Sequence, residues 1–268
     1  MSHHHPRDIR KKVTKFLSGI GVPEQKEFKP DTFQMEAIES LVSGQDTLVV
    51  APTGAGKTYI AVQAIKSFVQ QKKRAVYTAP LKALSNSKFA EFKKLFEPEF
   101  SVGLLTGDRK IEGGADIVVA TTEIYRNELY SYTETYSLVV LDEFHYLSDP
   151  QRGPVWEESI ILSPKSSTIL MLSASISNAQ EISNWIETVR GTKVKIIKVE
   201  KRPVELRLGF IHPDIGVIPL SDEDGNVMQE VVDAYQRREP QNYQRRGGGG
   251  NNNSRRGRSG GGSGRRRR

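Results

Sequence analysis

The sequence predicts an α/β fold in which a parallel sheet is flanked by helices. Two observations carry this prediction. Short, strongly apolar runs alternate with amphipathic runs along most of the chain, and a glycine-rich loop joins the first apolar run to the first amphipathic one. Strands that are apolar on both faces are typical of a sheet covered by helices on both sides. In such sheets, ligands bind beyond the carboxyl ends of the strands.

Seven apolar runs are the expected strands, at 47–51, 74–79, 101–106, 116–121, 137–142, 167–174 and 193–199. Five helical patterns lie between them, at 58–70, 81–96, 123–130, 155–162 and 179–189. In the last of these, Ile182, Trp185, Ile186 and Val189 recur at helical spacing, and Asn178 is a candidate N-cap. The expected organisation is a polar, helical lead-in at 1–24, a main α/β domain at 25–210, a connecting segment at 211–236 and a tail at 237–268.

The positive charge of the chain is concentrated in that tail. Residues 237–268 hold eleven Arg and one Glu, a net charge of +10, so the preceding 236 residues carry −3 of the total of +7. The Arg/Gly-rich tail has almost no apolar residues and is predicted to be disordered, either as an RNA-binding tail or as a linker. The sequence has no run of 18 apolar residues and no cysteine, which favours a protein of the reducing cytoplasm without a membrane span.

A phosphate-binding loop is predicted at "APTGAGKT", residues 51–58. Gly54 and Gly56 allow backbone N–H groups to converge on an anion, next to the positive end of the following helix. Lys57 is expected to reach the β- and γ-phosphates of a nucleotide, and the hydroxyl of Thr58 to hold Mg²⁺. The cradle itself is formed by Thr53, Gly54, Ala55 and Gly56. The usual motif begins with glycine, whereas this loop begins with Ala51.

A carboxylate pair follows the apolar strand "SLVVL". Asp142 is expected to hold the Mg²⁺ bound to ATP, and Glu143 to orient and deprotonate the attacking water. The alternative is a helix N-cap with one solvated acid. Together with the phosphate loop, the pair indicates hydrolysis of a nucleoside triphosphate but does not indicate its purpose.

The purpose of this hydrolysis is indicated by the resemblance of several sequence segments to those of a known protein family. "DEFH" (142–145), "SAS" (173–175), "FKPDTFQ" (28–34) and "APTGAGKT" resemble superfamily 2 helicases of the DExH-box kind. The segments "DEFHYLSDPQRGPVWEE", "PLKALSNSKF", "TTEIYRNEL" and "SISNAQEISNWI" are similar to those of the superkiller-like branch, the RNA helicases that feed the exosome. The resemblance runs from about residue 28 to residue 210 and implies the first RecA-like domain of such a helicase.

The resemblance also implies roles for single residues. Gln34 would read the adenine edge and Phe28 would pack on the adenine ring, although a core phenylalanine is an equal alternative. Contacts to the backbone of single-stranded RNA, without sequence preference, are implied for Pro80, Lys82, Thr106, Gly107, Thr121 and Thr122. Coupling of nucleotide state to RNA binding is implied for His145, Ser173 and Ser175. The motif "QRGPVWEE" marks the branch, and its Trp156 is expected to be a packing residue.

Helicases of this superfamily need a second RecA-like domain that contributes arginine fingers, and the segment after Phe210 shows no second core pattern. The sequence therefore favours the ATP-binding domain of an ATP-dependent RNA helicase, with ATP and Mg²⁺ as cofactors. Its expected partners are RNA, the missing second domain and RNA-degradation machinery. Two alternatives stay open: a DNA helicase of the same superfamily, and a non-enzymatic, ATP-responsive RNA-binding module.

Overall fold

The computed structural model describes residues 6–20, 29–131, 135–202 and 206–238. These residues form two compact units. The larger unit lies within residues 24–205 and contains the phosphate loop. The smaller unit combines described parts of residues 1–23 with residues that follow 205. Each unit has its own apolar core, so each is described separately.

The larger unit is built on one eight-stranded sheet with the strand order β4-β3-β5-β2-β6-β7-β1-β8. Its strands are β1 (Asp46–Val50), β2 (Ala75–Ala79), β3 (Val102–Leu105), β4 (Lys110–Ile111), β5 (Ile117–Thr121), β6 (Leu138–Leu141), β7 (Thr168–Ser173) and β8 (Val194–Lys198). All neighbouring strands are parallel except the short edge strand β4, which runs antiparallel to β3. The predicted parallel sheet is confirmed.

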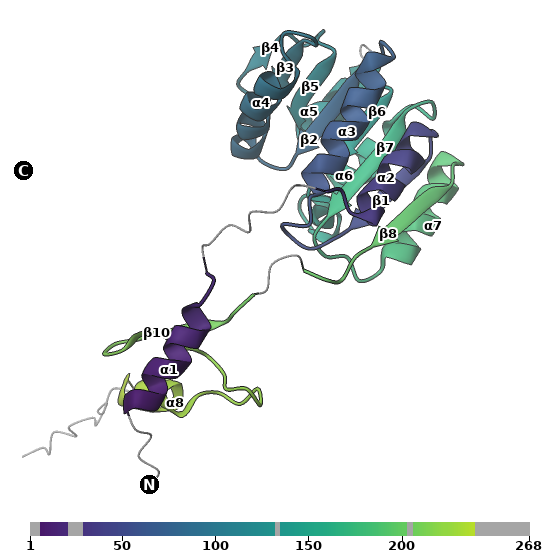
Figure 1. The fold of residues 1–268 in the computed structure, drawn as a ribbon. Helices are drawn as coiled ribbons and strands as arrows, with labels where there is room; N and C mark the ends of the chain where they lie inside the picture. The colour runs from purple at the N-terminus through teal and green to yellow at the C-terminus, as the bar shows by residue number, and fades with distance from the viewer. Residues whose placement is uncertain (1–5, 21–28, 132–134, 203–205, 239–268) are drawn as a thin grey trace, which may run out of the picture. The chain divides into compact units, whose positions relative to one another are not determined.

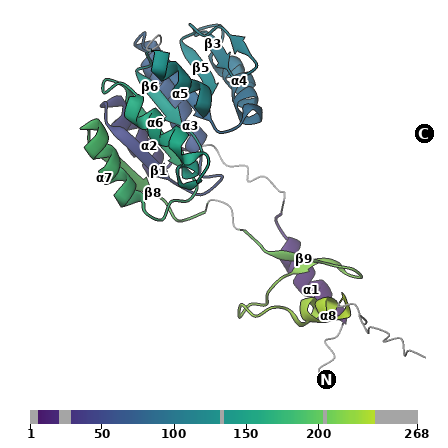
Figure 2. The ribbon, with the colours of Figure 1, turned by 180° about the vertical axis from the view of Figure 1, so that it is seen from behind.

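Helices cover both faces of this sheet (Figures 1 and 2). One face packs against α2 (Thr32–Val42), α3 (Lys57–Gln70) and α4 (Lys82–Phe96). The other packs against α5 (Thr122–Ser131), α6 (Gly153–Leu162) and α7 (Ala179–Arg190), with the 3₁₀ helix η1 (Phe144–Ser148) after β6. Successive strand residues point to opposite faces, which is why Val49 lies in the first core and Leu48 in the second.

The five predicted helices are all present, with ends shifted by at most two residues. Asn178 occupies the predicted N-cap position of α7, but it makes no capping hydrogen bond to the backbone. Its amide instead donates to the carboxylate of Glu181 at 3.3 Å. The described helices include none that is both long and apolar enough to cross a membrane.

A buried ion pair lies at the amino end of β1, opposite the phosphate loop. Nε of Arg190, on α7, donates to the carboxylate of Asp46 at 2.7 Å, and both side chains are at most 2% exposed. The same carboxylate accepts from the backbone N–H of Ile169 at 2.7 Å and from the hydroxyl of Thr192 at 2.9 Å. The guanidinium also donates to backbone carbonyls, among them that of Ser167 at 2.7 Å. Both charges are thus fully hydrogen-bonded.

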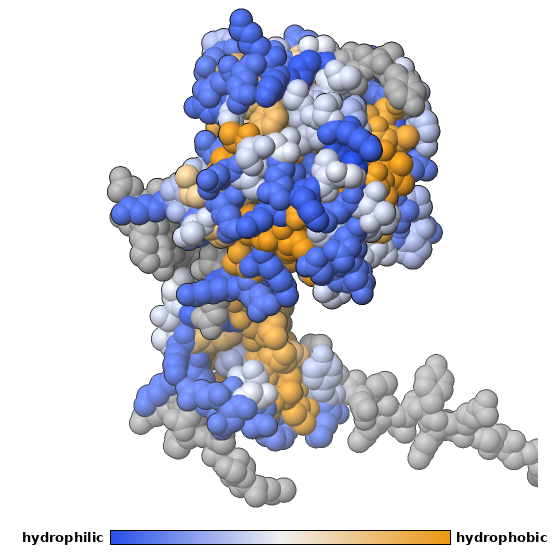
Figure 3. Space-filling view, turned by 90° about the vertical axis from the view of Figure 1, so that its right-hand side faces the viewer, coloured by the Kyte–Doolittle hydropathy of each residue, from blue (hydrophilic) through white to orange (hydrophobic). Residues whose placement is uncertain are grey.

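The smaller unit consists of α1 (Pro6–Leu17), a hairpin of β9 (Gly209–His212) and β10 (Gly216–Pro219), and α8 (Gln229–Arg238). Its small core contains Ile218, Met228 and Val231, against which Val13 and Phe210 pack. Much apolar surface stays exposed on this unit, for example at Leu206, Leu208 and Ile211 (Figure 3). Because α8 runs to Arg238, the first two residues of the predicted tail are helical. The rest of the tail lies outside the described residues.

Candidate functional site

Most of the predicted site residues lie at the carboxyl edge of the large sheet, because they follow parallel strands; Gln34 lies on α2, before the first strand. Strands β6, β7 and β1 are neighbours, and their carboxyl ends carry Asp142, Ser173 and the phosphate loop. Strands β3, β5 and β2 are also neighbours, and their carboxyl ends carry Thr106, Thr121 and Pro80. The nucleotide-binding and RNA-binding residues predicted from the sequence therefore occupy two adjacent halves of one edge.

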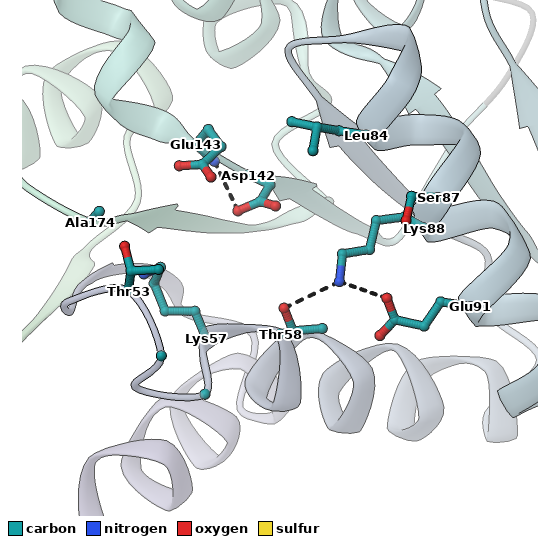
Figure 4. A pocket seen from close by; sticks show the side chains of 12 residues that line it. Thr53, Lys57, Thr58, Leu84, Ser87, Lys88, Glu91, Asp142, Glu143 and Ala174 are labelled. Atoms are coloured by element: carbon teal, nitrogen blue, oxygen red, sulfur yellow. Dashed lines mark hydrogen bonds and ion pairs between the residues drawn. The ribbon is translucent and has the colours of Figure 1, made fainter. Parts of the chain in front are cut away.

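A cavity of about 410 Å³ opens at the nucleotide half of this edge (Figure 4). The phosphate loop, the carboxylate pair and helix α4 all contribute to its wall. The lining residues are Thr53, Gly54, Gly56, Lys57, Thr58, Leu84, Ser87, Lys88, Glu91, Asp142, Glu143 and Ala174.

Two glycines with a left-handed backbone conformation shape the phosphate loop. Gly54 has a φ of +87° and Gly56, the N-cap of α3, a φ of +82°, a region that a side chain strongly disfavours. Lys57 follows at the first position of α3, and its ammonium donates to the carbonyls of Ala51 at 2.7 Å and Pro52 at 3.2 Å. Burial lowers the pKa of Lys57, and the nearby carboxylates of Glu143 and Asp142 oppose this shift.

Gln34 on α2 is buried against the phosphate loop. Its Oε1 accepts the backbone N–H of Asp31 at 2.9 Å, which closes a capping box, and its Nε2 donates to the carbonyl of Ala55 at 3.0 Å. A Cβ added at Gly56 would lie 2.3 Å from this Nε2, so the loop and the amide fit closely. The predicted adenine-reading amide therefore touches the predicted phosphate cradle. Phe28 lies outside the described residues.

The carboxylate pair is held by the ends of two neighbouring strands. Asp142 accepts a hydrogen bond from the hydroxyl of Tyr77, on β2, and another from the backbone N–H of Glu143 at 2.9 Å. Glu143 has a left-handed backbone, with φ of 52° and ψ of 44°, which is costly for a residue with a side chain. Its carboxylate lies 3.3 Å from Nδ1 of His145, without the alignment of a hydrogen bond.

Two residues of α4 that the sequence did not single out also line the cavity. Nζ of Lys88 lies 2.8 Å from Oε2 of Glu91 and donates to the hydroxyl of Thr58 at 3.4 Å. Figure 4 shows the lysine side chain reaching toward both partners. Their positions depend on the packing of α4 against α3. The spacing from Lys82 gives no signal for this placement, because six residues are about 1.7 helical turns and put the two lysines on different faces of the helix.

The cavity fits a magnesium nucleotide. The hydroxyl of Thr58 and the carboxylate of Asp142 are hard oxygen ligands of the kind that Mg²⁺ takes, and they line the same wall. No group of three or more His, Cys, Asp or Glu arranged to hold a metal occurs in the described part of the chain.

The RNA half of the edge brings three of its predicted residues together. Lys82, at the start of α4, lies 3.2 Å from the carboxylate of Asp108, which also accepts from the hydroxyl of Thr106 at 2.9 Å. The hydrogen bond from Thr106, followed by that from Lys82, lowers the pKa of Asp108. A Cβ at Gly107 would lie 3.7 Å from Nζ of Lys82. Lys82, Gly107 and Asp108 are exposed, whereas Thr106 is buried beside them.

The other three predicted RNA-binding residues are, like Thr106, buried in this structure. Pro80 follows β2, Thr121 ends β5 and Thr122 begins α5. The hydroxyl of Thr122 is buried without a hydrogen-bond partner among the described residues. Their roles toward RNA stay predictions.

The predicted coupling residues lie at or just after the carboxyl ends of β6 and β7, within the nucleotide half of the edge. Ser173 is fully buried at the end of β7, where its carbonyl accepts the backbone N–H of Ala51 and its hydroxyl accepts that of Ser175 at 3.3 Å. His145 lies on η1, 4.9 Å from the ring of Tyr146, which in turn stacks on Trp156. Trp156 is fully buried, as its expected packing role requires.

Comparison with known proteins agrees with this geometry. The profile of the DEAD/DEAH box helicases matches residues 31–182. The chain is 44% identical, over 74% of its length, to the DExH-box ATP-dependent RNA helicase DExH15 of Arabidopsis thaliana, described as chloroplastic. It is 39% identical over 77% of its length to the antiviral helicase SKI2 of Saccharomyces cerevisiae, and 40% identical over 75% to the superkiller complex protein 2 of Mus musculus. The chain spans 18%, 16% and 16% of these relatives.

The fold has a counterpart among solved structures. The DUF1998 helicase MrfA, in a crystal structure with DNA, aligns with a TM-score of 0.54 and 20% identity. The alignment covers 73% of this chain and 30% of that protein. At this level of identity the likeness concerns the fold alone.

Proposed function

Because the chain belongs to the DEAD/DEAH box helicase family, we propose that it is the ATP-binding domain of an ATP-dependent RNA helicase of the superkiller-like branch. One observation carries the proposal: Lys57, Thr58, Asp142 and Glu143 line a single cavity next to the edge that bears Lys82 and Thr106. The names of the similar proteins support RNA as the substrate, since they describe RNA helicases and a superkiller protein.

The residues of the cavity suggest how they divide the work. The N–H groups of the loop around Gly54 and the ammonium of Lys57 would bind the phosphates, and Thr58 and Asp142 would hold Mg²⁺. When bound, the ion neutralises charge that develops on the phosphate oxygens. Glu143 would orient the attacking water and accept its proton. Its strained backbone suggests that the surrounding fold holds it there for this purpose.

Further parts of the proposal concern the whole protein. A second RecA-like domain would supply the arginine fingers, which are worth about 10³–10⁵ in rate where they have been measured. The isolated chain would therefore bind ATP and hydrolyse it slowly. RNA would be gripped as a single strand without sequence preference, and RNA-degradation machinery would be the protein partner. We also propose a cytoplasmic location, on the cysteine-free composition.

Nucleotide titration tests the ATP site. The full chain is expected to bind a fluorescent ATP analogue in the presence of Mg²⁺, and Lys57→Ala to lose most of that affinity. The matched control is Lys66→Ala, an exposed lysine on the same helix. Glu143→Gln should keep binding but lower the residual turnover. Equal affinities of the wild type and Lys57→Ala would refute the proposed site.

The two alternatives are separated by the nucleic acid that stimulates turnover. In the chain supplemented with its second domain, stimulation by single-stranded RNA and not by DNA is expected. Stimulation by DNA alone would favour a DNA helicase. ATP binding without stimulated turnover by either would favour the non-enzymatic RNA-binding module.

A further inference from the structure

The mechanism above makes no use of Lys88 and Glu91, although both side chains enter the nucleotide cavity from α4. The ammonium of Lys88 is shielded, since its side chain is 22% exposed, and its two partners are Oε2 of Glu91 and the hydroxyl of Thr58. Thr58 is the proposed metal ligand. The ammonium of Lys88 therefore contacts the same hydroxyl oxygen that Mg²⁺ would use.

The ammonium of Lys88 is surrounded by oxygen atoms of the kind that bind a metal ion. A hydroxyl oxygen and a carboxylate oxygen contact it, and the carboxylate of Asp142 lines the same cavity. Mg²⁺ would approach the hydroxyl of Thr58 to about 2.0–2.1 Å. An ammonium at 3.4 Å from the same oxygen would then lie close to a divalent cation with little water between them, so the two charges repel strongly.

We propose that the ammonium of Lys88 occupies the cation position beside Thr58 until a magnesium nucleotide displaces it. The inference rests on the proposed nucleotide function. Glu91 makes the exchange possible, because it lies three residues further along the same helix and keeps the ammonium paired after it leaves Thr58. Lys57 differs in this respect, since its ammonium contacts backbone carbonyls of the loop rather than a predicted metal ligand.

The proposal has a consequence for the order of binding. Free Mg²⁺ has to compete with Lys88 for Thr58, and the metal alone brings no anion to compensate. A nucleotide brings phosphate oxygens that help to bind the metal. The cavity should therefore bind Mg²⁺ weakly without nucleotide and take both together.

Magnesium titrations of the full chain test the exchange. At each Mg²⁺ concentration, the affinity for a fluorescent ATP analogue is measured for the wild type, for Lys88→Met and for Lys94→Met. Methionine keeps the aliphatic stem without the charge, and Lys94 is an exposed lysine of the same helix. We expect Lys88→Met to lower the Mg²⁺ concentration at half-maximal effect at least about threefold, and Lys94→Met to match the wild type.

A second variant separates the roles of the pair. Glu91→Gln should raise the Mg²⁺ requirement when Lys88 is present, because the ammonium loses its charged alternative partner, and should have no effect in the Lys88→Met background. A rise in that background would make Glu91 a metal-facing residue and overturn the proposal. An unchanged requirement in Lys88→Met would overturn it too.

Direct metal binding gives a readout without nucleotide. Mn²⁺ binding followed by electron paramagnetic resonance should be tighter in Lys88→Met than in the wild type, and equal affinities would contradict the exchange. Thermal unfolding of each variant confirms that it is folded. Failure of the nucleotide site itself would appear differently, as equal nucleotide affinity in the wild type and Lys57→Ala.

Discussion

The hydroxyl of Tyr77 donates a hydrogen bond to the carboxylate of Asp142 across two neighbouring strands, β2 and β6. Tyr77 is fully buried, and its ring packs edge-on against Phe92 at a centroid distance of 5.2 Å. Burial, reinforced by the neighbouring Asp142 carboxylate, raises the pKa of Tyr77 well above its ordinary value. The phenol therefore stays a donor throughout the neutral range and fixes the orientation of the proposed metal ligand.

Tyr77→Phe removes this donor and keeps the ring. Groups that orient a metal ligand typically contribute about 10- to 100-fold to metal affinity. We expect the Mg²⁺ requirement for nucleotide binding to rise at least about tenfold. The control is Tyr125→Phe, which removes another buried tyrosine hydroxyl, bonded to Ser163 on the other side of the sheet. The same rise in both variants would mean that general loosening of the core, rather than Asp142, is responsible.

Gly56→Ala should disable the phosphate loop. The left-handed φ of +82° costs a residue with a Cβ roughly 1–2 kcal/mol, and the new Cβ meets Nε2 of Gln34 at 2.3 Å. A loss of nucleotide affinity of about tenfold or more is expected. Gly114→Ala is the matched control, since an added Cβ there has no atom within 4 Å. The two variants should differ in a nucleotide titration, and identical affinities would argue against the close fit.

Arg190→Met should destabilise the fold without changing the site. Removing one partner of a buried, hydrogen-bonded ion pair typically costs about 3–5 kcal/mol, because the other charge stays buried. Urea denaturation should show a loss of this size in the free energy of unfolding. Lys193→Met removes an exposed pair with Glu187 and should cost at most about 1 kcal/mol. A loss for Arg190→Met no larger than for Lys193→Met would show that Asp46 is accommodated without its partner.

Asp116, directly before β5, should make the free energy of unfolding depend on pH. The carboxylate of Asp116 accepts two hydrogen bonds from Ser101, one from its hydroxyl at 2.7 Å and one from its backbone N–H at 2.9 Å. These bonds lower the pKa of Asp116. A carboxyl group with a lowered pKa in the folded state stabilises the fold above its unfolded-state pKa. This contribution is lost as the pH falls through the folded-state pKa.

The comparison of wild type with Asp116→Asn measures this effect. The urea midpoint of the variant should lie below that of the wild type at neutral pH. The difference should shrink as the pH is lowered from about 5 to about 2. A difference that is independent of pH would assign the effect to geometry rather than to charge.

The sequence predicted the larger unit well because its information is local. Each of the seven predicted strands lies within one residue of an observed strand at either end, since apolar runs and glycine turns mark strands directly. The phosphate loop and the carboxylate pair were found in the same way. Helix α2 was not predicted, because it buries polar residues such as Gln34 and Ser40 that obscure its apolar period.

The contacts that the sequence did not predict join segments that are far apart in the chain but adjacent in the fold. Tyr77 meets Asp142 only because β2 pairs with β6, although β3, β4 and β5 lie between them in the chain. Lys88 meets Thr58 only because α4 lies next to α3 on the same face. The contact of α1 with the hairpin of β9 and β10 joins segments about two hundred residues apart. Local patterns carry no signal for such pairings.

Strand β1 divides two tasks between its ends. Its amino end bears Asp46, which is tied to Arg190 and to the backbone of β7, and its carboxyl end leads into the phosphate loop. One strand therefore carries a buried ion pair at one end and the proposed nucleotide site at the other. Variants at Lys57 or Glu143 are expected to persist in a cell as intact competitors for the same partners, whereas variants at Asp46 or Arg190 are expected to be removed as unfolded chains.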